Sequence, residues 1–571
     1  MKVRSWIALV VGTAVALACS YAAYTLANVS WNEVVEYRGP YAGVALPSTP
    51  APDHPPLKTT RVVYVVIDGL RDDVSRSMPS LQRLRDGGYD AVVRTGEPSL
   101  SFPNWTTLLS GASQRISGVT TNWFEGRVPV ETLVDVAVRS GRQVVVAAPK
   151  DFEQLYGVER AGSVYLRDWS KGAYMSTEIV DNAIRLSRDA TSALVIVLLP
   201  DVDEAGHASG GASAEYLATA KKVDADLARL VGALQDGTTT FVVASDHGHI
   251  DTGGHGGWER EVVQVPAVFA GPDIRLGKGT GTQDQIAPVV AYLAGLPALR
   301  NAASPPLIVT AAVPDGELAS DARFAALTAY LRVVQSGMPA GTTRVTTPVT
   351  AGDAAAGFAI ATEDRLSAER SERLPMALAL AAAAVAVLAA IGLLSWRALV
   401  SAGVGTVLYY LVYSGLFFLL HGYRWSLSSF NSEDLLKAFF NGRMIEAIVA
   451  GLVACFAAAD IYLALRRDPK RPTGEYLPGW LALGTATVLT IQATLALQVA
   501  WYLWRWGVAL TWVLPDFMWA FKYDLDLIQG TAIGALAILG PVVTYLAGRY
   551  HPIRKRVAPA AGETQLSEEE A

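Results

Sequence analysis

Hydrophobic residues in this sequence occur in two kinds of run, which predict two different kinds of structure. In the first half of the chain, short runs rich in valine and isoleucine are bounded by turn residues, as is typical of strands buried in a parallel sheet. Segments with helical periodicity separate these runs, and strands that alternate with helices predict an α/β fold with a mostly parallel sheet sandwiched by helices. The expected strands are residues 61–67, 143–148, 193–199 and 239–244, and the expected helices are residues 130–140, 177–188 and 214–234.

Two more elements are expected to complete this region, and a segment of different composition follows it. Residues 264–271 predict an edge strand, and residues 282–296 predict the last helix of the domain. Residues 311–373 are alanine-rich and polar, with one helical stretch at 321–334, which favours a stalk or a cap.

Long apolar runs predict that the chain crosses a membrane. Residues 5–26 carry no charge, follow the basic segment 1–4, and are about as long as a bilayer-spanning helix. They favour an uncleaved signal anchor, with a cleaved signal peptide as the alternative. Residues 49–57 contain four prolines and predict a linker. Five further spans, which would form an all-α transmembrane domain, are expected at residues 375–394, 399–420, 444–465, 479–503 and 527–547.

The basic residues predict the orientation of these spans. If residues 1–4 face the cytoplasm, the basic segments 466–471 and 549–556 fall on the same side, in agreement with the positive-inside rule. The α/β region then lies on the outer face of the cytoplasmic membrane. Residues 507–521 are apolar but interrupted by Pro515, and counting them as a seventh span would place the basic tail outside. An interfacial or re-entrant segment is therefore expected there.

Composition refines this picture. A formal net charge of −6 over 571 residues leaves no basic field of the kind that attracts nucleic acid. The two cysteines, Cys19 and Cys455, lie in apolar runs, which favours core or lipid-facing residues over a disulfide. The expected segments are a signal anchor at 1–28, a linker at 29–60, the α/β domain at 61–310, the cap or stalk at 311–373, a membrane domain of about five helices at 374–550 and a cytoplasmic tail at 551–571.

Candidate chemistry is concentrated at the ends of the expected strands. Three of the seven histidines lie in one glycine-rich stretch, and a fourth lies shortly after the third strand. An aspartate closely follows the first, the third and the fourth strand, and the carboxyl ends of parallel strands meet at one edge of a sheet. Carboxylates and neutral imidazoles gathered at such an edge predict a metal site. The residues concerned are Asp68, Asp203, His207, Asp246, His247, His249 and His255.

Five motifs, in this order, resemble the alkaline phosphatase superfamily, and most closely its type I phosphodiesterase/nucleotide pyrophosphatase branch. The resemblance covers about residues 61–308 and implies an alkaline-phosphatase-like catalytic domain. The plan of one N-terminal span, an exported domain and several C-terminal spans also resembles the ethanolamine-phosphate transferases of glycolipid anchor synthesis. The motifs are Asp68-Gly69-Leu70-Arg71, Pro98 to Asn104, Asp203 to His207, Asp246-His247 and Gly254-His255.

The resemblance implies two zinc ions and a serine nucleophile. The nearest branch usually has threonine at the nucleophile position, and Ser101 supplies the same kind of alkoxide. Trp105 stands where the sulfatase motif has arginine, which disfavours a sulfatase. One zinc would be held by Asp68, Ser101, Asp246 and His247, and the other by Asp203, His207 and His255.

The expected reaction begins with attack of Ser101 on phosphorus, after metal coordination has lowered the pKa of its hydroxyl. A helix expected from Asn104 to Ser110 would direct N–H groups at a phosphate oxygen, and Asn104 would donate a further hydrogen bond to it. We expect a membrane-anchored phosphodiesterase or phospho-group transferase whose substrate is a lipid- or glycan-linked phosphodiester such as phosphoethanolamine. The alternatives are a hydrolase of soluble nucleotides or small diesters, a sulfatase, and an inactive binding protein.

Some residues keep two interpretations. His249 either contacts a ligand or substrate or has no role in the site, and Asp201 either orients a histidine or occupies a plain turn. The predicted outer loops, residues 422–442 and 504–526, carry five tryptophans that would lie at the headgroup level. They either help to present a lipid substrate or only anchor the spans. These tryptophans are Trp425, Trp504, Trp506, Trp512 and Trp519.

Overall fold

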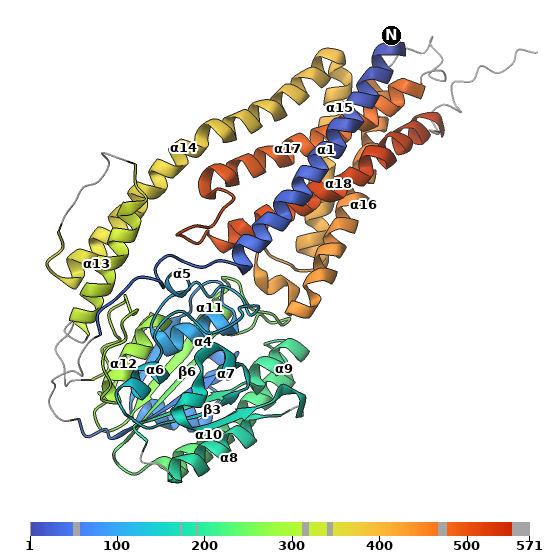
Figure 1. Cartoon of the computed structure of the whole chain (residues 1–571). Coiled ribbons are helices and arrows are strands. Elements are labelled where there is room, and N and C mark those ends of the chain that lie inside the picture. The colour runs from blue at the N-terminus through green and yellow to red at the C-terminus, as the bar shows by residue number, and fades with distance from the viewer. Residues whose placement is uncertain are drawn as a thin grey trace, which may run out of the picture.

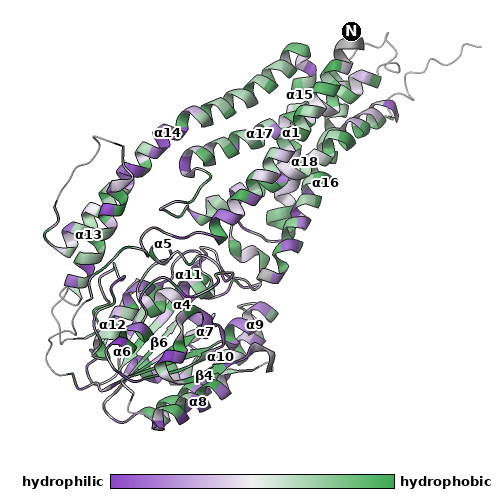
Figure 2. Cartoon of the chain, in the orientation of Figure 1, coloured by the Kyte–Doolittle hydropathy of each residue, from purple (hydrophilic) through white to green (hydrophobic). Residues whose placement is uncertain are grey.

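The structure, a computed structural model, describes residues 2–48, 57–171, 174–189, 192–310, 319–339, 347–465 and 477–550. It consists of an α/β domain and a bundle of long helices, which lie at opposite ends of the molecule in Figure 1. Figure 2 shows that the long helices are largely hydrophobic, whereas the helices around the sheet carry many hydrophilic residues. The expected linker at 49–57, the basic loop 466–471 and the tail 551–571 fall largely or wholly outside the described residues.

One eight-stranded sheet forms the centre of the α/β domain, in the order β4-β3-β5-β1-β6-β7-β2-β8. All neighbouring strands are parallel except for the two pairs that β7 makes with β6 and β2. The expected mostly parallel sheet and all five expected strands are confirmed. The strands are β1 (Arg61–Ile67), β2 (Tyr89–Arg94), β3 (Val144–Pro149), β4 (Gly162–Arg167), β5 (Leu194–Leu199), β6 (Thr239–Ser245), β7 (Gln264–Ala270) and β8 (Gly277–Thr282).

The prediction that residues 264–271 form an edge strand is wrong about position. β7 lies inside the sheet, because β2 and β8 extend the sheet beyond it. The hydrophobic pattern of the sequence predicts neither of these strands. β2 is a short run, and β8, which reads Gly-Lys-Gly-Thr-Gly-Thr, contains no hydrophobic side chain. The outer strands at the two edges are β4 and β8.

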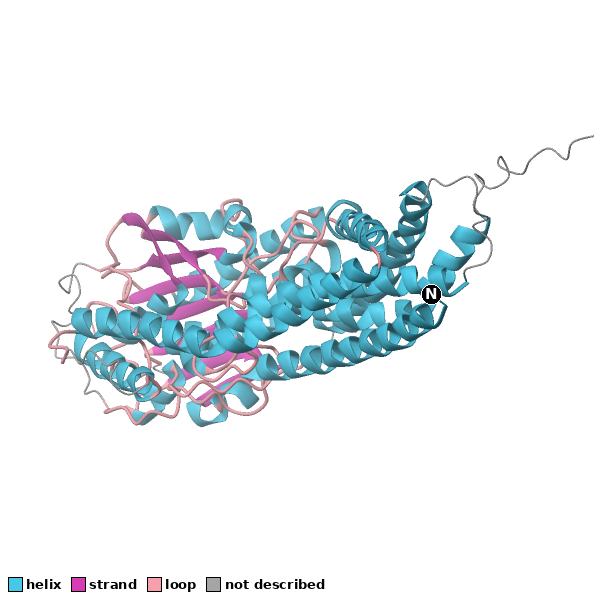
Figure 3. Ribbon diagram, turned by 90° about the horizontal axis from the view of Figure 1, so that it is seen from above, coloured by secondary structure: helices cyan, strands magenta, loops and turns pink. Residues whose placement is uncertain are grey.

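The sheet is buried on both faces, as Figure 3 shows by the helices that surround the strands. Alternate residues of β1 belong to two different hydrophobic clusters, which explains why this strand is continuously apolar. Helices α4, α6 and α12 contribute to one cluster, and α3, α8 and α10 contribute to the other. The helices of the domain are α2 (Asp72–Ser75), α3 (Pro79–Asp86), α4 (Ser101–Ser110), α5 (Gln114–Ser117), α6 (Leu133–Arg139), α7 (Asp151–Tyr156), α8 (Ser176–Asp189), α9 (Asp201–Ser209), α10 (Ala214–Leu234), α11 (Arg260–Val263) and α12 (Ile286–Leu293).

Six helices are long and apolar enough to span a membrane, which confirms the expected number of spans and describes a multi-pass membrane protein. Many of their large apolar side chains are exposed to the surroundings, as lipid contact requires. They are α1 (Lys2–Val35), α14 (Ala351–Leu394), α15 (Trp396–Ser414, continued by a π-helix at Gly415–Leu420), α16 (Leu436–Leu465), α17 (Leu477–Trp506) and α18 (Phe517–Tyr550).

Three spans begin well before the hydrophobic pattern predicts, and one of them is α16, which starts at Leu436 rather than at residue 444. α14 starts at Ala351, so the expected stalk continues directly into the membrane helix and packs against α13 (Ser320–Ser336). α18 starts at Phe517, and residues 507–516 form a non-helical connection between α17 and α18. Trp512 of this connection is buried, donates to Glu369 and stacks on arginines, so it is a packing residue rather than a headgroup anchor.

The orientation of the spans generates a prediction. In a variant without Cys19 and Cys455, a cysteine at Lys221, exposed on α10, should react with a membrane-impermeant thiol reagent in intact cells. A cysteine at Arg397, exposed at the start of α15, should be protected, because the basic segments place that end of the bundle in the cytoplasm. The reverse labelling pattern would overturn the outward location of the α/β domain.

Candidate active site

The candidate residues gather at the carboxyl edge of the three central strands. Asp68 follows β1 directly, Asp203 lies in the first turn of α9 after β5, and Asp246 follows β6. Because β5, β1 and β6 are neighbours in the sheet, these three segments lie side by side. Tight packing holds them there: a Cβ on Gly69 would lie 2.6 Å from the Cα of Asp203. Glycine is therefore required at the turn after β1.

Asp68, Asp246 and His247 form one group of ligand atoms, next to Ser101. Nε2 of His247 lies 3.4 Å from Oδ1 of Asp68, 3.5 Å from Oδ2 of Asp246 and 3.2 Å from the hydroxyl of Ser101. These two carboxylate oxygens are buried and have no hydrogen-bond partner among the described residues. Buried carboxylate oxygens normally have a partner, so this pair fits a bound cation.

Asp203, His207 and His255 form a second group. Oδ2 of Asp203 lies 3.3 Å from Nε2 of His207, one helical turn further along α9, and Nε2 of His255 lies 3.1 Å from the same imidazole nitrogen. The rings of His247 and His255 stack with centroids 3.7 Å apart, which joins the two groups. All seven candidate metal ligands thus lie in one cluster.

His249 belongs to this cluster more closely than the sequence indicates. Its Nε2 lies 2.7 Å from Oδ1 of Asp203, and its Nδ1 accepts a hydrogen bond from the backbone N–H of Gly254. His249 therefore orients one oxygen of Asp203 and ties it to the loop that carries His255. Asp201 has a different role: its carboxylate accepts hydrogen bonds from the backbone N–H groups of Met175 and Ser176 and so holds the start of α8.

The electrostatics of the cluster favour divalent metal. Burial raises the pKa of Asp68 well above its usual value, and the neighbouring Asp246 and Asp203 raise it further. Burial lowers the pKa of His249 and His255, which leaves their imidazoles neutral and able to donate a lone pair. Burial alone would also lower the pKa of His207, but Asp203 and its neighbours raise it to about 9. Carboxylates packed together beside neutral imidazoles match the ligand chemistry of zinc.

Ser101 is the first residue of α4, so the helix begins three residues earlier than expected. Its hydroxyl faces a pocket of about 330 Å³, the catalytic pocket, which Asn122 also lines. The carboxamide oxygen of Asn122 accepts a hydrogen bond from the backbone N–H of Phe102 at 2.9 Å. No pattern in the sequence marks Asn122, which lies in an irregular turn.

Asn104 is placed differently from Asn122. It is fully buried and its carboxamide oxygen accepts a hydrogen bond from Gln114 at 2.7 Å, while its Nδ2 has no partner among the described residues. Asn104 is not among the residues that line the catalytic pocket. A direct contact between Asn104 and substrate remains a prediction, and Asn122 is the carboxamide that the pocket exposes.

A loop from the membrane domain forms part of the catalytic pocket. We call residues 426–431, between α15 and α16, the docking loop. Its Asn431 donates a hydrogen bond from Nδ2 to the backbone carbonyl of His207 at 2.9 Å, and its Oδ1 lies 3.4 Å from Nδ1 of the same histidine. Phe430 and Asn431 both line the pocket. Residues more than two hundred positions apart thus share one site, which no local sequence pattern indicates.

The docking loop packs directly on the glycine loop, residues 253–257, which carries His255. A Cβ on Gly254 would lie 2.2 Å from the backbone oxygen of Ser428, and a Cβ on Gly257 would lie 1.7 Å from the hydroxyl of Ser426. The backbone N–H of Gly257 donates to the hydroxyl of Ser428. Glycine is thus needed here for close contact between the two domains.

Comparisons with known proteins were made for the whole chain. Residues 62–261 match the family of type I phosphodiesterase / nucleotide pyrophosphatase. GPI ethanolamine phosphate transferase 1 of Mus musculus is 25% identical over 342 residues, which are 50% of this chain and 35% of that protein. The catalytic subunit of human GPI ethanolamine phosphate transferase 2 is 26% identical over 269 residues, or 43% of this chain and 27% of that protein. The chain therefore spans about a third or less of these relatives.

Among solved structures, murine ectonucleotide pyrophosphatase / phosphodiesterase 5, an inactive variant in complex with AMP, is similar to this chain. The superposition has a TM-score of 0.37 and 14% sequence identity, and it covers 42% of this chain and 96% of that chain. A putative sulfatase from Bacteroides thetaiotaomicron is 16% identical with a TM-score of 0.34, over 42% of this chain and 71% of that chain.

The contact between the two loops generates a prediction. Gly254 and Gly237 have φ of +98° and +81°, so alanine at either position suffers backbone strain, on the order of 1–2 kcal/mol in a left-handed conformation. Only Gly254 would collide with a neighbour, because a Cβ on Gly237 meets nothing within 4 Å. Gly254→Ala should therefore lower the apparent melting temperature of the detergent-solubilised protein by several degrees more than Gly237→Ala. Equal shifts would contradict a tight contact between the loops.

Proposed function

With residues 62–261 matching the type I phosphodiesterase / nucleotide pyrophosphatase family, we propose that this protein is a zinc-dependent phosphodiesterase or phospho-group transferase of the cytoplasmic membrane. Its site would face the outer side, and its substrate would be a lipid- or glycan-linked phosphodiester such as phosphoethanolamine. The observation that carries the proposal is the position of Ser101. Its hydroxyl lies beside the carboxylate–histidine cluster, at a pocket that the membrane domain helps to form.

Two zinc ions fit the ligand cluster. When bound, zinc lowers the pKa of a coordinated hydroxyl or water and neutralises charge on the phospho group. The unpartnered oxygens of Asp68 and Asp246 support the first site, and the neutral imidazole of His255 supports the second. The proposed ligands are Asp68, Ser101, Asp246 and His247 for one ion, and Asp203, His207 and His255 for the other, with His249 also within ligand distance of Asp203 and His255.

Side chains and backbone groups of the protein then position the phosphate of the substrate for attack. The oxygen of Ser101 forms a bond to phosphorus while the bond to the leaving alcohol breaks, and that alcohol departs with a proton. Ser101 opens α4, so the positive end of the helix dipole favours the negative charge of an entering phosphate, while the N–H of Phe102 is engaged by Asn122. Asn122 presents a carboxamide to the same pocket. Water or an acceptor alcohol then attacks phosphorus and releases serine.

The membrane domain supports a substrate that is held in or near the bilayer. An anchor alone would not need to contact the ligand cluster, yet Asn431 bonds twice to His207 and the glycine loop fits the docking loop closely. The relatives named GPI ethanolamine phosphate transferases support the choice of a phosphoethanolamine-type group. We therefore propose that a headgroup reaches Ser101 while its apolar part remains at the membrane.

The nucleophile generates the first prediction. Ser101→Ala should reduce turnover of a phosphodiester substrate by at least about a hundredfold, because no other hydroxyl replaces the one beside His247. Melting temperature should stay unchanged. Ser113→Ala, at a half-buried serine before α5, is the matched control and should keep full activity. A Ser101→Ala variant that retains more than a few per cent of turnover would show that another group attacks phosphorus.

The metal site generates a second prediction. Elemental analysis should find two zinc per chain, and chelation should abolish an activity that zinc restores better than calcium. Asn431→Ala should weaken zinc binding by about 10–100-fold, because the partner of a metal-binding histidine fixes its ring. Asn441→Ala, at an exposed asparagine of α16, is the control. A single calcium per chain would instead support the sulfatase alternative, and unchanged zinc affinity in Asn431→Ala would remove the proposed role of Asn431.

A further inference from the structure

One buried serine joins the segment that carries the nucleophile to the loop that carries His255. Ser99 lies two positions before Ser101, is fully buried, and forms an isolated antiparallel bridge with Gly256 of the glycine loop. Its backbone N–H donates to the carbonyl of Gly256 at 3.3 Å. Its hydroxyl accepts a hydrogen bond from the N–H of Gly256 at 3.1 Å and donates one to the carbonyl of Gly257 at 2.7 Å. Ser99 therefore holds the glycine loop with both its backbone and its side chain.

The backbone carbonyl of Ser99 also fixes a candidate metal ligand. It lies 3.0 Å from Nδ1 of His255, and because a carbonyl oxygen can only accept, Nδ1 carries the proton. The lone pair of the neutral imidazole is then on Nε2, which lies 3.1 Å from Nε2 of His207. A hydrogen bond of this kind sets the tautomer and the ring orientation of a metal-binding histidine. Ser99 thus presents His255 to the ligand cluster.

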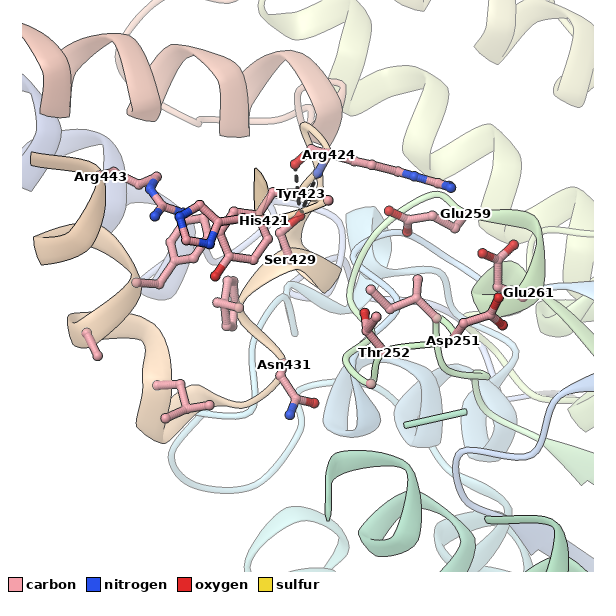
Figure 4. A pocket seen from close by; sticks show the side chains of 17 residues that line it. Asp251, Thr252, Glu259, Glu261, His421, Tyr423, Arg424, Ser429, Asn431 and Arg443 are labelled. Atoms are coloured by element: carbon pink, nitrogen blue, oxygen red, sulfur yellow. Dashed lines mark hydrogen bonds between the residues drawn. The ribbon is translucent and has the colours of Figure 1, made fainter. Parts of the chain in front are cut away.

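The docking loop holds the same glycine loop from the membrane side. The backbone N–H of Gly257 donates to the hydroxyl of Ser428 at 3.1 Å, and this buried hydroxyl donates to Oε2 of Glu259 at 2.9 Å. Figure 4 shows Glu259 pointing toward the segment of the membrane domain that carries Ser429 and Asn431. Gly257 is therefore bonded at its carbonyl to a serine of the α/β domain and at its N–H to a serine of the docking loop.

Close packing on both sides of Gly256 reinforces this arrangement. A Cβ at that position would lie 3.0 Å from Cδ2 of Leu100, next to the nucleophile, and 3.1 Å from Cβ of Leu427 in the docking loop. The glycine loop is thus clamped between the two segments, with no space in which it could shift alone. Since packed interiors transmit displacements, a movement of the docking loop moves the glycine loop and with it His255.

We propose that Ser99 is a positioning residue for one of the two zinc ions, and that Ser428 acts on the same ion through Gly257. We call this ion the second ion, and its proposed ligands are Asp203, His207 and His255. Docking of the membrane domain then sets the affinity of the second ion. The first ion keeps ligands at the ends of β1 and β6, which Ser99 does not contact. The inference rests on the two-zinc site of the proposed function.

The test measures zinc binding by the metal-free, full-length protein in competition with a chromophoric chelator, which requires neither substrate nor turnover. Wild-type protein should give two dissociation constants. Ser99→Ala should raise one of them by about tenfold or more, the lower end of the effect of losing an outer partner of a metal ligand, because the carbonyl at position 99 remains but is no longer held. His255→Ala should retain only the other constant, which identifies the one that changed.

Ser110→Ala is the matched control. Ser110, at the end of α4, is as buried as Ser99, and its hydroxyl likewise donates to a backbone carbonyl, that of Thr106, and accepts from a backbone N–H, that of Ala112. Ser110→Ala should lower the melting temperature about as much as Ser99→Ala does but leave both zinc constants unchanged. A rise of both constants in Ser99→Ala, or of neither, would overturn the proposal.

The coupling to the membrane domain is tested with Ser428→Ala. This variant should raise the same constant as Ser99→Ala, and the double variant should raise it by less than the product of the two single factors, because both residues act through one loop. Factors that multiply fully would overturn the coupling. If Ser99→Ala does not fold, Ser428→Ala decides alone, and an unchanged second constant rejects the inference. Wild-type protein that binds no zinc would instead contradict the proposed function.

Discussion

The burial of three carboxylates against one another is the constraint on which the rest of this structure depends. Asp68, Asp203 and Asp246 all lie at the carboxyl edge of the sheet and are almost inaccessible to water. Such an arrangement needs protonation or nearby positive charge: burial and the neighbouring carboxylates raise the pKa of Asp68, whereas His207 and the other histidines hold the pKa of Asp203 well below its usual value. The apolar strands, the tight turn at Gly69 and the glycine loop hold these groups close together, in an arrangement that could share bound cations.

A second constraint comes from the contact between the domains. The docking loop contacts His207 and the glycine loop that carries His255, and glycines with no room for a side chain lie along this contact. The cluster is therefore completed by a part of the chain that lies between two membrane helices. In the proposed function, this contact would couple the chemistry of the α/β domain to the membrane and give the bundle a role beyond that of an anchor.

Much of the fold could be predicted from the sequence because its signals are local. The first strand, residues 61–67, has the same limits in the structure, and all six spans are found, since continuous apolar runs of these lengths have few alternatives. β8 could not be predicted, because its residues are held by pairing with β2 rather than by burial of their own side chains. The late start assigned to α18 has a different cause, because Lys522, Asp524 and Asp526 interrupt the apolar pattern after the first turn, although Asp526 is buried and paired with Lys522.

The residues of the candidate site also fall into those that the sequence predicts and those that it does not. The candidate metal ligands lie at the ends of strands and in short motifs, so the sequence alone predicts that they come together. Asn122 and Asn431 carry no motif, and each acquires its position through contacts with residues far away in the chain. Trp512 was expected at the membrane surface and is instead buried against arginines, because tertiary contacts override the preference of a single side chain.

The most direct test of the central claim is to locate metal in crystals of the full-length protein grown with zinc. Anomalous diffraction recorded above and below the zinc absorption edge should give two peaks. One should lie among Asp68, Asp246, His247 and Ser101, and the other among Asp203, His207 and His255, with Asn431 against the second. No peak at either position, with the carboxylates instead paired to protons or to basic side chains, would contradict a two-zinc site completed by the membrane domain.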